Sequence, residues 1–205
     1  MTTAKTRKGK TPSKQGRGRP RCEEAHKKIL KAAYEMLDEV GFMDLTIEGV
    51  AARAEVGKPT IYRRWKTKAQ LAMDAFLSAV NPEIAFPDTG SVEEDFREQM
   101  NKIVNLMNSS RGEILATVIG SGQVDDNLMA AFRENWLLPR REDAKRIFQR
   151  GVEREELRDD VDAEVAIDAL YSPLFYRLLL KHLPLSDNFV DELIDVVFKG
   201  LAVND

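Results

Sequence analysis

The chain has 205 residues, of which 43% are hydrophobic and 32% are charged, and its formal net charge is −3. This length can bury one large core or two modest ones, and the composition is typical of a globular protein. No stretch approaches the roughly 18 to 20 consecutive apolar residues that cross a bilayer, and the first residues lack the apolar centre of a secretory signal. We therefore expect a cytoplasmic protein without membrane contact.

Few side chains are available for metal binding or nucleophilic catalysis. Cys22 is the only cysteine, so one chain can build neither an internal disulfide nor a thiolate metal cage. His26 and His182 are far apart, without acidic residues at ligand spacing, and no nucleophile has a base nearby in the sequence. We expect no metal, no cofactor and no enzyme; a helical enzyme with a C-terminal cavity is the alternative that turnover assays would test.

Positive charge is concentrated at the start of the chain. Residues 1–21 contain eight basic residues and no acidic one, which leaves 23 basic against 34 acidic residues in the remainder. Because this segment has no apolar periodicity with which to form a core, we predict that residues 1–22 are a disordered basic arm. A basic arm on an acidic body is typical of a chain that binds a polyanion at one end.

Within the arm, Arg17, Arg19 and Arg21 alternate with a glycine and a proline. This run resembles an A·T hook, in which extended backbone lies in a narrow minor groove whose negative potential attracts arginine. A nonspecific basic tail is the alternative, and both versions predict that affinity for DNA depends strongly on salt.

The remainder is predicted to be all-α, because helical periodicity recurs throughout and no alternating strand pattern is present. A first helix is expected from about Glu24 to Gly41. Its apolar stripe consists of Leu30, Ala33, Leu37 and Val40. A fourth helix, opened by a capping box at Thr67 and Gln70, is expected to run to about residue 80.

Residues 46–65 have the pattern of a helix-turn-helix. Thr46 can cap a short helix, Glu55 to Gly57 form a turn, and a third helix follows near Lys58. Ile61 and Trp65 are four residues apart and are expected to anchor this third helix to the core. A short helix fixed on a small tri-helical support suits the DNA major groove, which is about 12 Å wide.

The third helix and its flanks supply the side chains that we expect to contact DNA. From Lys58 to Lys68 there are five basic residues and no acidic one. The predicted contact residues are Thr46, Lys58, Thr60, Tyr62, Arg63, Arg64, Lys66 and Lys68, with Arg17, Arg19 and Arg21 of the arm.

Different roles are expected along this surface. Lys58 and Thr60 can approach base edges or phosphate, Tyr62 can meet a thymine methyl or a phosphate, and one of Arg63 and Arg64 can read guanine while the other contacts the backbone. The remaining residues, Thr46, Lys66 and Lys68, suit phosphate clamping.

Residues 81–90 contain two prolines and a glycine and break the helical pattern. We therefore predict a DNA-binding domain over residues 23–80 and a second helical domain over residues 81–205. After a helix that Ser91 and Glu94 open, the second domain is expected to have helices at about 111–121, 126–137, 139–154, 162–182 and 187–201.

The last two predicted helices are more apolar than a single packing face requires. Ala169 to Leu180 is apolar on nearly every face, and the segment from Phe189 to Leu201 has a double-width apolar face. We interpret these helices as candidates for a homodimer interface. The alternative is that both simply complete the core of the monomer.

Several short motifs resemble the TetR family of regulators, and the resemblance covers roughly residues 25–75. They are Ile29–Ala33, Val40–Phe42, Leu45–Ile47, Val50–Ala54 and Gly57–Trp65. The segment from Asp162 to Leu185 also resembles one C-terminal subgroup of that family. The sequence departs from common forms at Glu55, where glycine is frequent, and at Gly57, where a capping residue often stands.

The resemblance implies an all-α homodimer whose recognition helices enter successive major grooves of a palindromic operator, and a C-terminal domain that binds a small effector. Its pocket would lie among Phe96, Met100, Val104, Met107, Ile119, Phe132, Trp136, Phe148, Tyr171 and Phe175. These side chains indicate a largely apolar effector, with fewer than half of them in contact with it. The function implied is a repressor that the effector releases from double-stranded DNA.

The alternatives are an activator, an effector-independent regulator of the same fold, and an architectural DNA-binding protein.

Pro173 lies inside a predicted long helix and should bend its axis. We expect effector binding to move this region together with the fourth helix.

Overall fold

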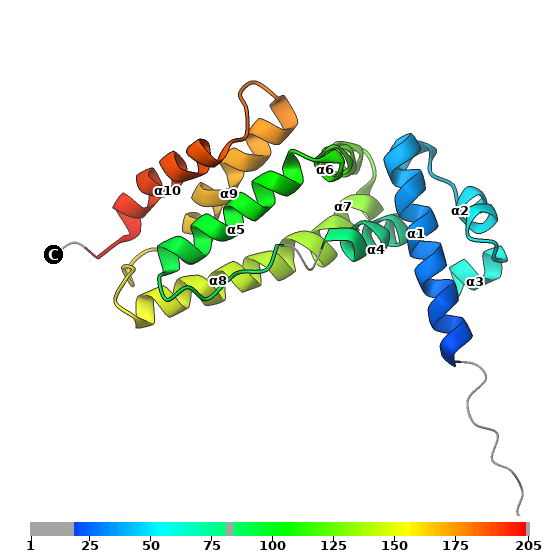
Figure 1. Ribbon diagram of the computed structural model, residues 1–205, viewed down its shortest axis with the longest axis horizontal. Coiled ribbons are helices and arrows are strands. Elements are labelled where there is room, and N and C mark those ends of the chain that lie inside the picture. The colour runs from blue at the N-terminus through cyan, green and yellow to red at the C-terminus, as the bar shows by residue number, and fades with distance from the viewer. Residues whose placement is uncertain (1–18, 81–83, 204–205) are drawn as a thin grey trace, which may run out of the picture.

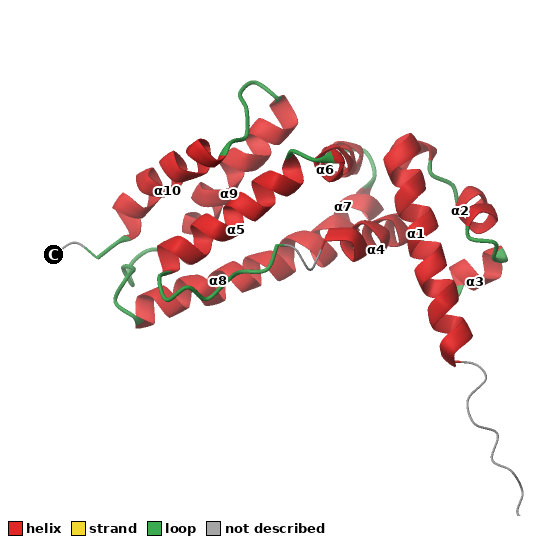
Figure 2. Ribbon diagram, viewed as in Figure 1, coloured by secondary structure: helices red, strands yellow, loops and turns green. Residues whose placement is uncertain are grey.

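The computed structural model describes residues 19–80 and 84–203, which are all-α, with one isolated bridge between Leu157 and Ala202 (Figures 1 and 2). The head contains α1 (Arg19–Asp44), α2 (Ile47–Arg53) and α3 (Lys58–Tyr62), and α4 (Lys68–Val80) joins it to the body. The body contains α5 (Val92–Met107), α6 (Ser110–Gly122), α7 (Asp126–Phe132), the π-helical turn η2 (Arg133–Leu137), α8 (Leu138–Glu153), α9 (Ala163–Leu180) and α10 (Asp187–Leu201).

The first helix begins at Arg19, five residues before the predicted start. Its proline lies in the first turn, where the missing N–H has no intrahelical partner to lose. At the other end Gly41 has φ 73° and ψ 177°, which interrupts the helix at the residue where an end was predicted. The core-facing stripe includes Leu37, but Val40 is 45% exposed, so its assignment to the stripe was wrong.

The fourth helix begins with the predicted cap. The Gln70 backbone N–H donates to Thr67 Oγ1 at 3.1 Å, and Gln70 Oε1 accepts from the Lys66 backbone N–H at 3.1 Å. Most of α4 is buried because it packs against α1 on one side and against α7 and η2 on the other. Head and body therefore touch through α4, and also where α1 packs against α6.

The α7, η2 and α8 segments form one continuous helical rod, although a break before Pro139 was predicted. Proline lacks the N–H for an i→i−4 bond, and its ring crowds the preceding turn. The chain widens into a π turn here, where the Leu138 N–H donates to the Arg133 carbonyl oxygen. The π turn lets the helix continue and places Trp136 inside, 2% exposed.

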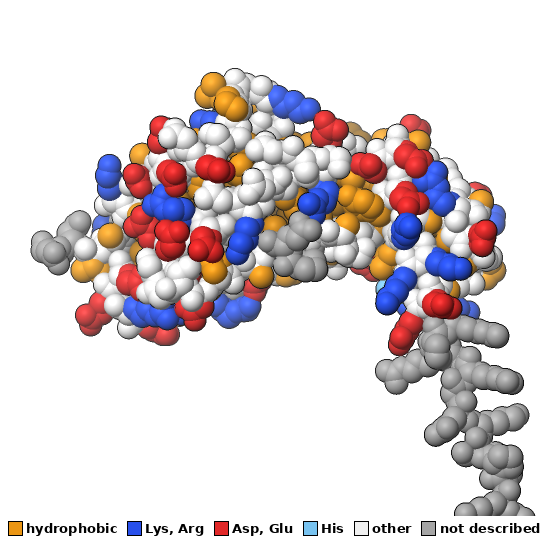
Figure 3. Space-filling view, viewed as in Figure 1, with side chains coloured by type: hydrophobic (Ala, Val, Ile, Leu, Met, Phe, Trp, Pro, Cys, Tyr) orange, Lys and Arg blue, Asp and Glu red, His pale blue; other side chains and the backbone are white. Residues whose placement is uncertain are grey.

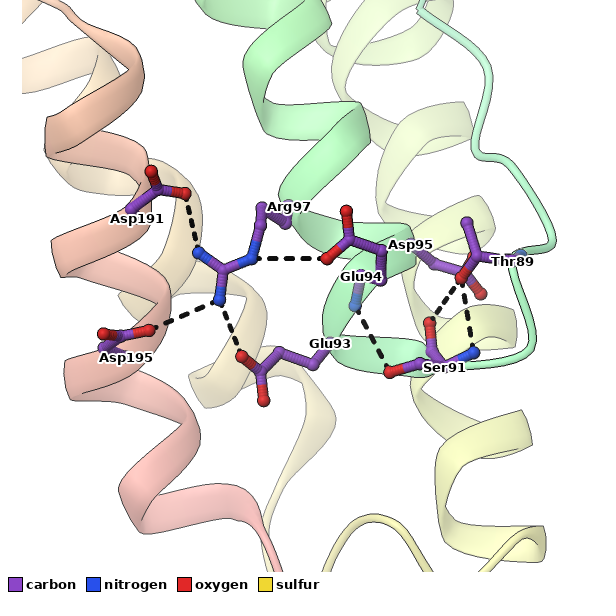
Figure 4. Close-up of polar contacts among 8 residues, drawn as sticks. All are labelled: Thr89, Ser91, Glu93, Glu94, Asp95, Arg97, Asp191 and Asp195. Atoms are coloured by element: carbon purple, nitrogen blue, oxygen red, sulfur yellow. Dashed lines mark hydrogen bonds and ion pairs between the residues drawn. The ribbon is translucent and has the colours of Figure 1, made fainter.

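An ion-pair cluster fastens α10 to α5 (Figure 4). The Arg97 guanidinium contacts Asp191 at 2.7 Å and Asp195 at 3.3 Å on α10, and Glu93 at 2.7 Å and Glu94 at 3.5 Å on its own helix. Burial alone would lower the Arg97 pKa, but the hydrogen bonds that Arg97 donates to Asp191, Glu93 and Asp195 raise it well above its usual value. Acidic and basic side chains are mixed over this end of the molecule (Figure 3).

The non-helical segment before α5 is held down by buried polar groups. Asp95 is completely buried, and its Oδ1 accepts from the Thr89 backbone N–H at 2.7 Å and from the Thr89 hydroxyl at 2.8 Å. The Arg150 guanidinium of α8 pairs with the same carboxylate. The approach from α4 to α5 is thus anchored to the body of the protein.

Candidate nucleic-acid interface and ligand cavity

The turn between α2 and α3 has the geometry expected of a helix-turn-helix. The Gly49 backbone N–H donates to Thr46 Oγ1 at 3.1 Å, so the Thr46 hydroxyl caps α2 as predicted. Glu55 has φ 54°, the left-handed conformation that favours glycine, and Gly57 is the N-cap of α3 without a side-chain bond. Glu55 and Gly57, the two positions where the sequence departs from common family forms, thus lie in the turn itself.

Two anchors fix α3 to the core. Ile61 is 0% exposed and Trp65 is 3% exposed, as their spacing predicted. The Trp65 indole N–H donates to Asp74 of α4 at 2.7 Å, and its ring stacks on His26 of α1 with centroids 5.2 Å apart. Regular helix ends at Tyr62, short of the predicted residue 65, and a helical turn carries the chain to Trp65.

The opposite side of α3 and its flank carry most of the predicted DNA-contact residues. The exposed ones are Lys58, Tyr62, Arg63, Arg64 and Lys66, and Thr60 is half-buried. These residues lie on a short element that is held rigidly, because the anchors Ile61 and Trp65 fix the rotation of α3 about its axis. A basic face held in this way can be presented to a groove as a unit.

Two of the predicted lysines have partners within the head. Lys58 Nζ lies 3.0 Å from Glu48 Oε1 of α2, a hydrogen-bonded pair that raises the Lys58 pKa and lowers that of Glu48. Lys68 Nζ donates to the Met43 carbonyl oxygen at 3.0 Å and lies over the Phe42 ring. A phosphate must therefore compete with Glu48 for Lys58. The Lys68 contacts also connect the start of α4 to the end of α1.

Sequence reasoning missed Glu48 because nothing in helical spacing links it to a lysine ten residues later across a turn. The arm residue Arg17 lies outside the described residues. Arg19 and Arg21 belong to α1, so their backbone is helical here and not extended as expected for this part of the A·T-hook run, and their contact with the minor groove stays a prediction. The helix is possible there because the proline occupies its first turn.

A small cavity of about 50 Å³ lies in the body between α5, η2, α8 and α9. Three of the predicted effector residues, Trp136, Tyr171 and Phe175, line it. Five others, Phe96, Met100, Val104, Phe132 and Phe148, are buried outside its lining, while Ile119 is half-buried and Met107 borders a different groove. Sequence periodicity could not separate lining side chains from packed ones.

Three polar lining residues, Gln99, Arg140 and Arg141, were not predicted. Gln99 is 2% exposed; its Oε1 accepts from the Tyr171 hydroxyl at 2.6 Å, and its Nε2 donates to the Ile84 carbonyl oxygen at 3.3 Å. Burial raises the Tyr171 pKa well above its usual value, so the hydroxyl is a neutral donor. A glutamine on an amphipathic helix normally faces solvent, so no pattern in the sequence marked Gln99 as buried.

Arg140 forms part of the wall of the cavity. Its guanidinium lies over the Trp136 ring, 3.6 Å from the centroid, and donates to the Trp136 carbonyl oxygen at 3.0 Å. Burial lowers the Arg140 pKa to about 10, against the opposing influence of Asp143. The group is still a cation at neutral pH, and it is held against an aromatic surface.

A three-helix head with a reading helix on a helical body defines a helix-turn-helix DNA-binding regulator. Residues 29–75 match the family model described as bacterial regulatory proteins, tetR family, and residues 86–197 match the tetracyclin repressor-like C-terminal domain. The chain therefore belongs to the TetR family of transcriptional regulators, which are not enzymes. None of the helices in the described part of the chain is long and apolar enough to cross a membrane.

Relatives match over most of the chain. The HTH-type transcriptional regulator YdeS of Bacillus subtilis is 41% identical over 90% of this chain and 93% of its own. A DNA-binding transcriptional repressor TetR of Mycobacteroides abscessus is 31% identical over 82% of this chain and 89% of its own. Among solved structures, the TetR family transcription regulator SCO0332 has a TM-score of 0.76 and 34% identity, and the match covers 88% of this chain and 100% of that one.

Proposed function

We propose that this protein is a homodimeric repressor that binds a palindromic operator and is released from it by a small, largely apolar effector. One contact carries the proposal. Trp136, which lines the cavity, packs against Phe76 of α4 with ring centroids 5.2 Å apart, and α4 holds the reading head. A molecule that enlarges the cavity would push on the element that orients α3.

A second route leads from the cavity toward the head. Gln99 joins the Tyr171 hydroxyl on α9 to the Ile84 carbonyl oxygen in the segment that follows α4. A ligand that takes the Tyr171 hydrogen bond would loosen this connection. Release requires only that the ligand binds the two arrangements of head and body with different affinities.

The exposed face of helix α9 supports the proposal of a dimer. One face packs into the body through Ala166, Ile167, Leu170, Leu174 and Leu178. The opposite face exposes Val165, Ala169, Ser172, Tyr176 and Leu179, spaced four, three, four and three residues apart. A largely apolar stripe at this spacing suits a helix pair across a two-fold axis.

The names of two relatives or neighbours favour repression and effector release. The relative from Mycobacteroides abscessus is named a repressor. A structural neighbour with 15% identity and a TM-score of 0.61, FadR of Bacillus subtilis, was solved in complex with stearoyl-CoA. The shared fold can therefore hold an apolar molecule.

The proposal is tested by selecting bound fragments from a random DNA pool with the full-length protein. We expect inverted repeats whose half-site centres lie about one helical turn apart or a multiple of it. Placed in a promoter in front of a reporter, the selected sequence should lower expression when the protein is present. Recovery of unrelated sequences would contradict the operator, and raised expression would contradict repression.

A further inference from the structure

An acidic and a basic side chain meet across the turn between α2 and α3, which lie next to each other on the far side of α1 from the body (Figure 1). Lys58 Nζ, at the start of α3, lies 3.0 Å from Glu48 Oε1 in the first turn of α2, and both side chains are exposed. Lys58 and the exposed Tyr62 are four residues apart, so they share one face of α3. Glu48 therefore lies beside the predicted DNA-contact residues although it is an acid.

An acid at this place weakens binding to the phosphate backbone. Lysine is a mobile point charge that phosphates attract, but Lys58 already has an anionic partner. A phosphate that took Lys58 would have to displace Glu48 or approach its negative charge. Both groups are ionised at neutral pH, because their hydrogen bond raises the Lys58 pKa and lowers that of Glu48. The pair thus adds little to affinity that is independent of DNA sequence.

The pair instead matches the edge of one base pair in the major groove. In a guanine–cytosine pair, the guanine O6 acceptor and the cytosine N4 donor are hydrogen-bonded to each other, so they lie about 2.9 Å apart. The Lys58 Nζ donor and the Glu48 Oε1 acceptor lie 3.0 Å apart. An ammonium group has three N–H donors, so Nζ can keep Glu48 and also donate to guanine. The carboxylate can accept from the cytosine amino group at the same time.

The same match fixes the orientation of the base pair. Lys58 must lie over guanine and Glu48 over cytosine, because the reversed pair would place the ammonium beside an amino group and the carboxylate beside O6. A thymine–adenine pair presents its O4 and amino group in the same order, but it lacks the guanine N7 acceptor and adds a methyl group. A guanine–cytosine pair in one orientation is therefore favoured.

We propose that Glu48 is a specificity-determining residue that, together with Lys58, reads one guanine–cytosine base pair in each half-site of the operator. This inference rests on the proposed function and deepens it, because it names a base pair that the head recognises. Glu48 accepts from the cytosine and also keeps Lys58 away from the phosphates. A carboxylate in the first turn also stabilises α2 through the helix dipole, but that effect is the same for every DNA sequence.

Anisotropy titrations of the full-length protein with variants of the selected operator test the inference. Each base pair of the half-site is reversed in turn, in both half-sites together. At one guanine–cytosine position, reversal should lower the affinity of the parent about tenfold or more, and Glu48→Ala and Lys58→Ala should each reduce this preference to less than about threefold. The double variant should lose no more of the preference than either single variant, because the two side chains act as a unit.

Glu39→Ala is the matched control. Glu39 of α1 forms an exposed ion pair with Arg53 of α2 in the same head, with Oε2 2.7 Å from the guanidinium, so the change removes the same charge and also breaks an ion pair. It should leave the preference at every position intact. Because the readout is a ratio of affinities for two DNA molecules, a partly unfolded preparation lowers both alike and does not change it.

A Glu48→Ala protein that keeps every base-pair preference of the parent would overturn the inference, and so would a Glu48-dependent position occupied by an adenine–thymine pair. Loss of the same preference in Glu39→Ala would also overturn it, since the effect would then come from charge in general. If an operator is selected and Glu48 affects none of its positions, the proposed function stands and only this inference fails. If no inverted repeat is selected, the proposed function fails, and this inference with it.

Discussion

Glu55 is held in a left-handed backbone conformation at the centre of the helix-turn-helix, with φ 54°. A side chain costs about 1 kcal/mol in that conformation, and part of the gain from glycine is lost to greater freedom of the unfolded chain. Glu55→Gly should therefore raise the free energy of unfolding by about 0.5 kcal/mol, measured by urea denaturation. Ala52→Gly, an exposed helical change in α2, should lower it by about 0.5 to 1 kcal/mol. A loss of stability in Glu55→Gly would contradict the account of this turn.

His26 predicts a pH dependence of stability. Burial against Trp65, aided by the positive charge of Arg64, lowers the His26 pKa below the ordinary histidine value of 6.5, and Asp74 opposes this only in part. Because the folded state favours the neutral ring, the contribution is fully present above pH 6.5 and is lost as the pH falls toward the folded pKa. Urea denaturation from neutral to acidic pH should show a smaller decline in His26→Gln than in the parent. An equal decline would sink this assignment.

Arg63 and Lys66 should affect DNA binding differently. Both side chains are exposed, but Arg63 follows directly on α3 while Lys66 lies beyond the Trp65 anchor. Arg63→Ala should cost about 1 to 3 kcal/mol on the selected operator and little on scrambled DNA. Lys66→Ala should weaken both similarly and reduce the salt dependence. Anisotropy titrations at several salt concentrations measure both effects. An equal loss of affinity for both DNA molecules in Arg63→Ala would show that Arg63 contacts phosphate and not a base.

At this scale, the sequence predicted residues that follow a periodicity and missed those that depend on a partner elsewhere. Ile61 and Trp65 are four residues apart, which places them on one helical face, and both are buried. Gln99 looks like a surface residue in the same kind of pattern. Its burial results from α9 packing across α5 and from the Ile84 carbonyl, neither of which is encoded locally.

Among the helices, α9 has the clearest unpartnered face. Val165 is 63% exposed and Leu179 is 42% exposed, although the opposite face of the helix is in the core. Val165→Asp combined with Leu179→Asp should convert the protein to a monomer in light scattering while preserving its circular dichroism, because each charge would be buried at the interface. Val124→Asp, at a position 81% exposed in the turn after α6, is the matched control and should stay dimeric. A dimer that survives the double change would move the interface elsewhere.

Helix boundaries were predictable where a cap marks them. Thr67 and Ser91 each precede a helix and accept from a backbone N–H three residues later, as the capping pattern indicates. The helix break predicted before Pro139 was wrong, because a π turn accommodates the proline and the helix continues past it. Which faces are left exposed on α9 also depends on how α5, α8 and α10 assemble, so the sequence left the dimer interface and the monomer core as open alternatives.

The whole molecule consists of a DNA-binding head and a cavity-bearing body, which meet through α4 and where α1 packs against α6. The sequence predicted two domains from the break after residue 80, between α4 and α5. It could not predict that Phe76 of α4 touches Trp136 in the cavity wall, since that contact joins residues sixty positions apart. In the proposed function, this contact is the route by which a change in the cavity would alter the angle of α3.

The central claim is that α3 reads sequence in a two-fold complex. The most direct measurement compares equilibrium affinities of the full-length protein for the selected operator and for the same DNA with one half-site scrambled, at about 150 mM salt. We predict that the affinity falls about 10³-fold or more when one half-site is scrambled, because both protomers of a single complex read a half-site each. Equal affinities for the two DNA molecules would contradict the account and leave a protein that binds the phosphate backbone alone.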